Sequence, residues 1–132
     1  MVSNELELFY FLRDNIFPNL KKSSSTFSHY DCYTNTHYIE LKCRKKHYDD
    51  LMIEKIKYDN LVSNAKKLNL HPMYISSTPK GLYAFYLNDI NIKWYEKKLP
   101  KTTEFNDNSD IIKTIGMLHY SKGIDLTKKF PF

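Results

Sequence analysis

A chain of 132 residues, 42% hydrophobic and 15% aromatic, can bury one core but is too short for two sizeable domains. Two cysteines are too few for a disulfide framework, and their spacing with the five histidines matches no familiar zinc site. The net charge of +5 weakly favours a polyanionic partner, and the lack of a signal-peptide pattern or a long apolar run predicts a soluble intracellular protein with no membrane contact.

The first predicted element is a helix over SNELELFYFLRDNIF, residues 3–17, with Ser3 or Asn4 as its N-cap. At about 100° per residue, the apolar side chains form one arc that also contains Glu5, whereas Glu7 points away from it. A carboxylate inside an apolar arc must reach a polar site or be buried at a cost. Glu7 lies three residues after Asn4, which explains it structurally as part of a capping box.

Two strand candidates follow the first helix. Residues 27–34 and 37–43 have strand composition and are separated by a two-residue turn, which predicts a β-hairpin. Beyond the hairpin, Asp50 can cap a second helix that runs to about Leu68.

The second half of the chain is predicted to be mostly strands. Residues 72–88 form two strands around a turn at 79–81, and residues 90–99 add another strand. Residues 102–110 are polar and loop-like, and residues 111–126 form a strand, a turn and a short strand. With no internal repeat and no domain boundary, the order of elements indicates an α/β or α+β domain with a central sheet.

The predicted hairpin has two different faces. With its turn at Asn35 and Thr36, residue 31 lies opposite residue 40, and side chains alternate between the faces. One face carries His29, Asp31, Tyr33, Tyr38, Glu40 and Lys42. The other face is apolar and carries Tyr30, Cys32, Ile39, Leu41 and Cys43.

Asp31 and Glu40 form a like-charged pair in this register. Opposed Cβ atoms lie about 5 Å apart, where two carboxylates repel by about 3 kcal/mol at an effective dielectric near 20. Lys42 as a counter-charge, a proton shared by the two acids, or a divalent cation could each offset this repulsion. A solvent-facing strand with mixed charges and no chemistry is the structural alternative, and a one-residue slip of register would separate the acids.

Asp31, followed by Glu40 and Lys42 in IELKCR, resembles the PD-(D/E)xK nuclease motif, in which an Asp ending one strand faces an acidic-x-Lys on the next. The helices before and after the hairpin agree with the core of that family, so the resemblance covers about residues 3–88. Tyr30 stands where the motif's name has Pro. IELKCR together with IEKIKYDNL is similar to a small phage-type branch of these nucleases.

The resemblance implies an α/β fold with a restriction-endonuclease-like core, in which a central mixed β-sheet is flanked by helices. Residues 1–132 then form a single nuclease-like domain, with its core at about 3–88 and extra C-terminal strands at about 89–132. It also implies a cytoplasmic protein of a bacterium or a phage-infected host cell, acting as a monomer or a homodimer.

The resemblance further implies the chemistry of the site. Asp31, Glu40 and the backbone carbonyl of Leu41 would bind Mg²⁺ or Mn²⁺ through hard oxygen ligands. Lys42 would orient the attacking water and stabilise charge developing on the scissile phosphate. Glu5 is the candidate for a fourth acidic ligand, with Glu7 as the fallback. The candidate DNA-contacting residues are Arg44, Lys45, Lys46 and Lys57.

The predicted function is that of a metal-dependent DNA endonuclease acting in replication, recombination, repair or phage genome processing, with branched DNA among its substrates. The alternative is a noncatalytic protein that binds nucleic acid or a host protein and uses the acidic pair and Lys42 as a surface ion network. Strand scission that depends on Mg²⁺ distinguishes the first reading from the second.

Overall fold

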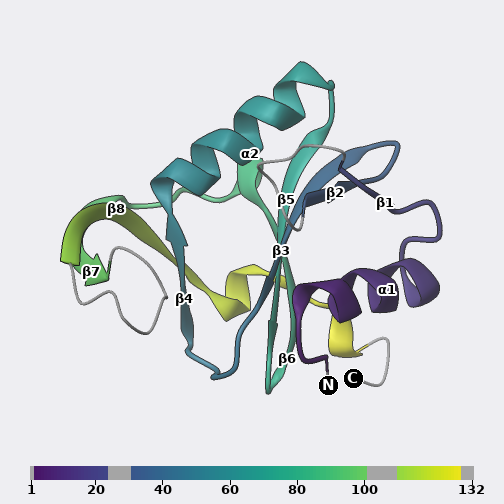
Figure 1. Cartoon of the computed structure of the whole chain (residues 1–132), viewed down its shortest axis with the longest axis horizontal. Coiled ribbons are helices and arrows are strands. Elements are labelled where there is room, and N and C mark those ends of the chain that lie inside the picture. The colour runs from purple at the N-terminus through teal and green to yellow at the C-terminus, as the bar shows by residue number, and fades with distance from the viewer. Residues whose placement is uncertain (1, 24–30, 101–109, 129–132) are drawn as a thin grey trace.

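The computed structural model describes residues 2–23, 31–100 and 110–128. Within these residues the chain forms a six-stranded mixed sheet, a three-stranded antiparallel sheet and two α-helices (Figure 1). The fold is therefore mixed α/β with a central mixed sheet, as expected. None of the described helices is long and apolar enough to cross a membrane.

The large sheet has the strand order β1-β2-β3-β5-β6-β9. Its strands are β1 (Lys21–Lys22), β2 (Asp31–Tyr33), β3 (His37–Cys43), β5 (His71–Thr78), β6 (Gly81–Tyr86) and β9 (Ile124–Asp125). β3 and β5 are parallel, and all other neighbours in this sheet are antiparallel. A parallel pair needs a long crossover, which here runs through β4 and α2.

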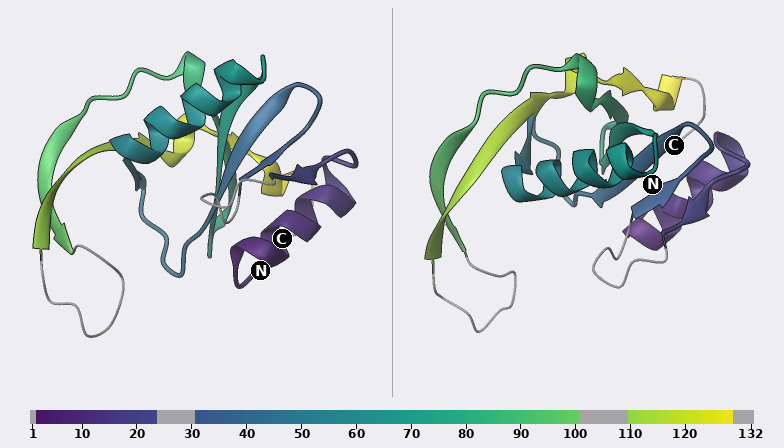
Figure 2. Two further views of the ribbon diagram at one scale, coloured as in Figure 1. Left: turned by 45° about the horizontal axis from the view of Figure 1, so that its top comes forward. Right: turned by 90° about the horizontal axis from the view of Figure 1, so that it is seen from above.

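The small sheet has the order β4-β8-β7, from β4 (Asp50–Glu54), β8 (Asp110–His119) and β7 (Tyr95–Pro100). Both views in Figure 2 show the β7–β8 ribbon curving away from the large sheet. The short 3₁₀ helices η1 (Leu87–Asp89), η2 (Tyr120–Lys122) and η3 (Leu126–Lys128) connect or follow strands.

Helix α1 (Glu5–Asn15) packs on one face of the large sheet (Figure 1). Asn4 is its N-cap, and the Asn4 side chain accepts a hydrogen bond from the backbone N–H of Glu7 at 2.9 Å. The carboxylate of Glu7 accepts from the N–H of Ser3 at 2.6 Å, so Glu7 acts at the helix start, although its partner is the residue before the N-cap and not Asn4 itself, as it would be in a capping box. The core on this side contains Leu8, Phe9, Leu12, Cys32, Ile39, Leu41, Met73, Ile75, Leu82 and Ala84.

Helix α2 (Lys55–Lys67) packs on the opposite face, through Leu61 and Ala65. Its neighbours include Tyr38, Tyr74 and Phe85 from the large sheet, and Leu51, Ile53 and Leu118 from the small sheet. The face of the hairpin that carries the acids is therefore partly a second core, because Tyr38 is buried there at 3% exposure. The sequence predicted a core only on the other face.

The predicted helix from Asp50 to Leu68 is wrong in its first five residues. Asp50 is not a helix cap: residues 50–54 form β4 and pair with β8, and α2 begins at Lys55 with Glu54 as its N-cap. Leu51 and Ile53 alternate into the core, as strand residues do. The pairing partner lies about 60 residues later in the chain, so local propensity could not reveal it.

Other predicted elements agree with the structure. β3 has the predicted bounds, β5 and β6 pair around a turn at Pro79 and Lys80, and the last strands appear as β8 and β9. The predicted strand before Pro100 exists as β7 and begins at Tyr95. Residues 27–30 of the predicted first hairpin strand, and most of the predicted loop at 102–110, lie outside the described residues.

Candidate active site

The register of the β2–β3 hairpin brings the two acids together. Asp31 pairs with Glu40, and Tyr33 pairs with Tyr38, which confirms the predicted register. The N–H of Thr34 donates to the carbonyl of His37 at 2.9 Å, so the odd-numbered residues of β3 direct their backbone groups toward β2. Asp31 and Glu40 are then a non-hydrogen-bonded pair, the kind in which opposed side chains approach most closely.

The carboxyl group of Glu40 is the most perturbed acid of this site. Burial, followed by the charge of Asp31, raises its pKa from 4.5 to about 7, while Lys57 and Lys42 act in the opposite direction. Its Oε2 atom is buried and has no hydrogen-bond partner among the described residues. A buried carboxylate oxygen without a donor is costly, so this atom favours either a proton or a cation.

Asp31 is positioned by a neighbouring tyrosine. The hydroxyl of Tyr38 donates to Oδ2 of Asp31 at 3.1 Å and lies 3.4 Å from Oγ of Ser23. Because Tyr38 is buried beneath α2, its hydroxyl is fixed and holds the Asp31 carboxylate in one orientation. The sequence places Tyr38 on this face, but its role as a hydrogen-bond donor to Asp31 was not predicted.

Lys42 lies on the same face of β3 as Glu40, two residues farther along, and its ammonium group is half-buried. Burial lowers its pKa, as do the positive charges of Lys57 and Arg44, whereas Glu5 and Glu40 raise it. The charged residues that act on Lys42 are therefore ones that the sequence also predicted for the site.

Glu5 reaches the end of β3 from α1. Its Oε1 lies 3.4 Å from the backbone N–H of Cys43, which donates to it, and its charge acts on Lys42. Because backbone groups of alternate strand residues share a side, the carbonyl of Leu41 points toward the same edge as the N–H of Cys43. Glu7 is engaged at the start of α1 instead, so Glu5 is the helical acid nearer to the site.

The predicted DNA-contacting residues that follow β3 differ in their surroundings. Arg44 is held inside the protein, because its Nε donates to Oγ of Ser76 at 3.1 Å and its Nη2 donates to the hydroxyl of Tyr74 at 3.3 Å. A further bond joins Arg44 to the carbonyl of Met52 on β4. This guanidinium therefore connects β3, β5 and β4 behind Lys42.

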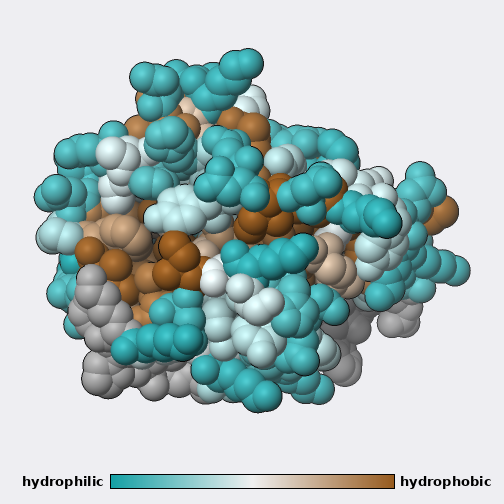
Figure 3. Space-filling model, turned by 180° about the vertical axis from the view of Figure 1, so that it is seen from behind, coloured by the Kyte–Doolittle hydropathy of each residue, from teal (hydrophilic) through white to brown (hydrophobic). Residues whose placement is uncertain are grey.

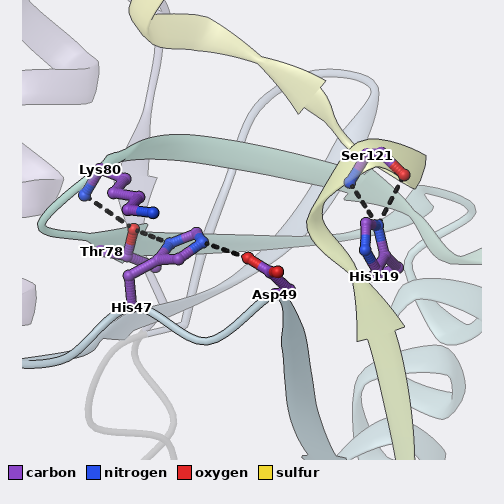
Figure 4. Close-up of polar contacts among 6 residues, drawn as sticks. All are labelled: His47, Asp49, Thr78, Lys80, His119 and Ser121. Atoms are coloured by element: carbon purple, nitrogen blue, oxygen red, sulfur yellow. Dashed lines mark hydrogen bonds and ion pairs between the residues drawn. The ribbon is translucent and has the colours of Figure 1, made fainter.

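Lys45 and Lys46 are exposed, as a role in contacting phosphates requires. The next residue, His47, turns back into the protein: one ring nitrogen lies 2.9 Å from Oγ1 of Thr78 and the other 3.2 Å from Oδ1 of Asp49 (Figure 4). These two contacts fix the loop after β3 against the β5–β6 turn.

Lys57 lies near the site, as the sequence suggested, and a second acid accompanies it. Lys57 acts electrostatically on both Glu40 and Lys42. Glu54, at the junction of β4 and α2, lies 3.9 Å from Lys57 and 3.0 Å from Lys113 of β8, and its charge also raises the pKa of Glu40. Neither Glu54 nor Lys113 was predicted to belong to the site. Glu54, like Glu5, is an acid among apolar residues in the sequence, and this pattern could have identified it.

The oxygen atoms of this site fit a hard divalent cation that retains several waters. Among the described residues, no three or more His, Cys, Asp or Glu side chains come together as a metal-binding group. Asp31 and Glu40 instead offer a pair of carboxylates. Oε2 of Glu40, which has no hydrogen-bond partner among the described residues, is one ligand atom that they supply. Mg²⁺ is commonly held by one or two carboxylates, with water and substrate phosphate as its other ligands.

No known family model matches the sequence, and no curated protein matches it significantly. A solved structure is similar to it: Hjc, a Holliday junction resolvase from the archaeal hyperthermophile Archaeoglobus fulgidus. The TM-score is 0.60 at 14% sequence identity, over 96% of this chain and 95% of that chain. The similarity shows that the chain has a restriction-endonuclease-like fold like that of Hjc, as the motif resemblance implied.

Proposed function

We propose that this protein is a divalent-metal-dependent DNA endonuclease that cuts branched DNA during recombination. One observation carries the proposal: a buried Glu40 oxygen, which has no hydrogen-bond partner among the described residues, belongs to a close pair with Asp31, and Lys42 follows on the same face. The fold shared with a Holliday junction resolvase supports the choice of branched DNA. Among the described residues no third acidic side chain joins the pair as a metal-binding group, and Mg²⁺ commonly takes water and substrate phosphate as its remaining ligands.

The residues divide the reaction among them. Bound Mg²⁺ or Mn²⁺ supplies Lewis-acid activation of the scissile phosphate and of the attacking water. Asp31, Glu40 and the carbonyl of Leu41 would hold the cation, with Glu5 of α1 as a further acid. Water attacks phosphorus and loses a proton to solvent, the bond to the leaving oxygen breaks, and the leaving oxygen takes up a proton from solvent. Lys42 directs its ammonium group at the phosphate oxygens and stabilises the added negative charge.

Lys42 is suited to this role because the opposing charges around it leave its ammonium group available to the phosphate. Glu40 and Glu5 attract the ammonium group, while Lys57 and Arg44 repel it. Arg44, tied to Ser76 and Tyr74, forms the rigid support behind this strand end. Lys45 and Lys46 follow at the surface and contact the phosphate backbone on one side of the cut.

The test is cleavage of a synthetic four-way junction and a matched linear duplex, with Mg²⁺ or Mn²⁺ and then with EDTA. The wild-type protein should cut the junction only with metal, and Lys42→Ala should reduce cleavage at least about a hundredfold while the melting temperature stays within a few degrees. Lys122→Ala, which removes an exposed lysine of η2, is the matched control. Junction binding that ignores Mg²⁺, with no scission by the wild type, would instead support the noncatalytic alternative.

Paired cuts across a junction require two sites, so a homodimer belongs to the proposal. Sedimentation of the free protein and of its junction complex tests this part separately. A complex containing one protein chain per junction would exclude paired cutting by a dimer while leaving the nuclease assignment intact.

A further inference from the structure

A hollow lies beside the acidic pair, between the tip of the β2–β3 hairpin and the C-terminal end of α2. Its volume is about 390 Å³, within the usual range for small-molecule sites, and it opens to solvent on one side. It is lined by Ser23, Tyr33, Thr34, Asn35, Tyr38, Leu68 and Leu70.

The hollow shares a wall with the acidic pair. Tyr33 lies two residues after Asp31 on the same face of β2, a separation of about 7 Å along a strand. Tyr38 is a second lining residue, and its hydroxyl donates to the Asp31 carboxylate at 3.1 Å. A group seated in the hollow is therefore adjacent to whatever Asp31 binds.

The lining selects a neutral, flat ligand. None of the described residues that line the hollow carries a charge at neutral pH, so these residues do not attract a phosphate. The part-exposed Tyr33 offers a stacking surface, the two leucines offer apolar contact, and the amide of Asn35 offers a donor and an acceptor. A nucleobase has this combination of an aromatic face and a polar edge.

We propose that this hollow receives the base of an unpaired nucleotide next to the phosphodiester that is cut. The inference deepens the proposed function and rests on it. A base inside a continuous duplex is stacked and paired, and extracting it costs a few kilocalories per mole. A base at a branch point has already lost a stacking neighbour, so the hollow selects junctions by the unpaired nucleotide that they offer.

The experiment places 2-aminopurine, a fluorescent base, at the nucleotide next to the cut in a four-way junction. Binding is followed with Mg²⁺ in a Lys42→Ala background, so that the strand stays intact. A base that enters the hollow against Tyr33 should change the fluorescence, and adding Tyr33→Ala should weaken junction binding about tenfold and abolish that change. Tyr33→Phe, which retains the ring, should restore it.

Tyr10→Ala, at an exposed tyrosine on the outer side of α1, is the matched control. Asn35→Ala tests the rim without disturbing packed residues, and should reduce the preference for a junction over a duplex. The inference is overturned if Tyr33→Ala binds the junction with the same affinity and fluorescence as its parent.

The two proposals fail differently. A wild-type protein that cuts junctions, together with a Tyr33→Ala variant that retains the full preference for them, excludes the base site and leaves the nuclease standing. A wild type that cuts nothing, but gives the Tyr33-dependent fluorescence change, excludes the nuclease and supports a base site in a binding protein.

Discussion

Folding places the carboxyl group of Glu40 where its charged form is unfavourable. The strand pairing that makes the sheet also places its carboxyl group against Asp31, and packing under α2 removes solvent from one of its oxygens. Lys57 and Lys42 offset only part of the cost, because the pKa remains raised to about 7. A group that folding has destabilised in its charged form gains most from a bound cation.

The raised pKa of Glu40 predicts how stability depends on pH without metal. Below pH 4.5 the carboxyl group is protonated in both the folded and the unfolded chain, and stability is highest with respect to this group. Between pH 4.5 and about 7 the unfolded chain has released a proton that the folded chain retains, so the free energy of unfolding falls over this range, by about 3 kcal/mol at most.

Urea unfolding in EDTA at pH 5 and pH 8 measures this loss. Glu40→Gln should remove most of it, and therefore be the more stable protein at pH 8. Glu96→Gln, which neutralises an exposed acid on β7, is the control and should retain the wild-type loss. Parallel pH profiles for Glu40→Gln and the wild type would contradict the assignment.

Metal binding should reverse the same cost. Because a ligand that binds only the folded state stabilises it, millimolar Mg²⁺ or Mn²⁺ at pH 8 should raise the melting temperature of the wild type. Glu40→Gln and Asp31→Asn should show little or no rise. This measurement needs no cleavage, so it examines the cation site independently of activity. Equal rises in all three proteins would place the cation elsewhere.

At the scale of elements, α1 separates the roles of two nearby glutamates. Glu7 accepts from Ser3 at the helix start, whereas Glu5 contacts the N–H of Cys43 at the end of β3. Glu7→Gln should cost up to about 1 kcal/mol of unfolding free energy and leave the cleavage rate near that of the wild type. Glu5→Gln should slow cleavage about tenfold or more with a small change in stability. Chemical denaturation and junction cleavage, measured on both variants, test this division, and a reversal of the two effects would make Glu7 the helical acid of the site.

The small sheet depends on a close approach at Gly116 of β8. A Cβ atom at this position would collide with Ile92 and would lie 3.1 Å from the ring of Trp94, which packs edge-on against Tyr58 of α2. Gly116→Ala should therefore destabilise the protein by about 1 to 3 kcal/mol, as measured by thermal unfolding. Ile112→Ala, at a side chain that is 68% exposed on the same strand, should change stability by less than about 0.5 kcal/mol. A stable Gly116→Ala protein would mean that the side chains of Ile92 and Trp94 shift to accommodate the added methyl group.

At the scale of the whole molecule, the net charge of +5 conceals an uneven use of the basic residues. Lys113 and Arg44 are engaged with protein groups, whereas Lys45 and Lys46 are exposed beside the site. Exposed hydrophobic side chains are also spread over several elements, and the back of the molecule in Figure 3 shows hydrophobic patches between hydrophilic residues. Charge near the acidic pair is therefore the better guide to where the proposed DNA substrate would bind.

Lys45→Ala and Lys46→Ala should each weaken junction binding and reduce the slope of log affinity against log salt by about 1. Lys122→Ala should leave the slope unchanged.

Arg44→Ala should mainly lower the melting temperature, because it leaves the buried hydroxyls of Tyr74 and Ser76 without that donor. Binding titrations across a salt series, with melting curves for each variant, distinguish the two kinds of loss. A normal slope for both lysine variants would move the DNA path away from the strand end.

The sequence by itself determined the parts of the fold that depend on neighbours in the chain. An N-cap at Ser3 or Asn4, the bounds of β3, the β5–β6 turn and the register that opposes Asp31 to Glu40 follow from local hydrogen bonding and from the strict alternation of strand side chains. The acid pair and Lys42 were visible for that reason.

Only the tertiary structure decided what surrounds that pair. Residues 50–54 form a strand because β8 is there to pair with them, and that pairing brings Glu54 and Lys113 to the site. The burial of Tyr38 under α2, and the internal use of Arg44, likewise depend on segments distant in the sequence. Periodicity reports which side chains share a face, but the solvent exposure and charge of each depend on what packs over that face, and long-range contacts alone fix that.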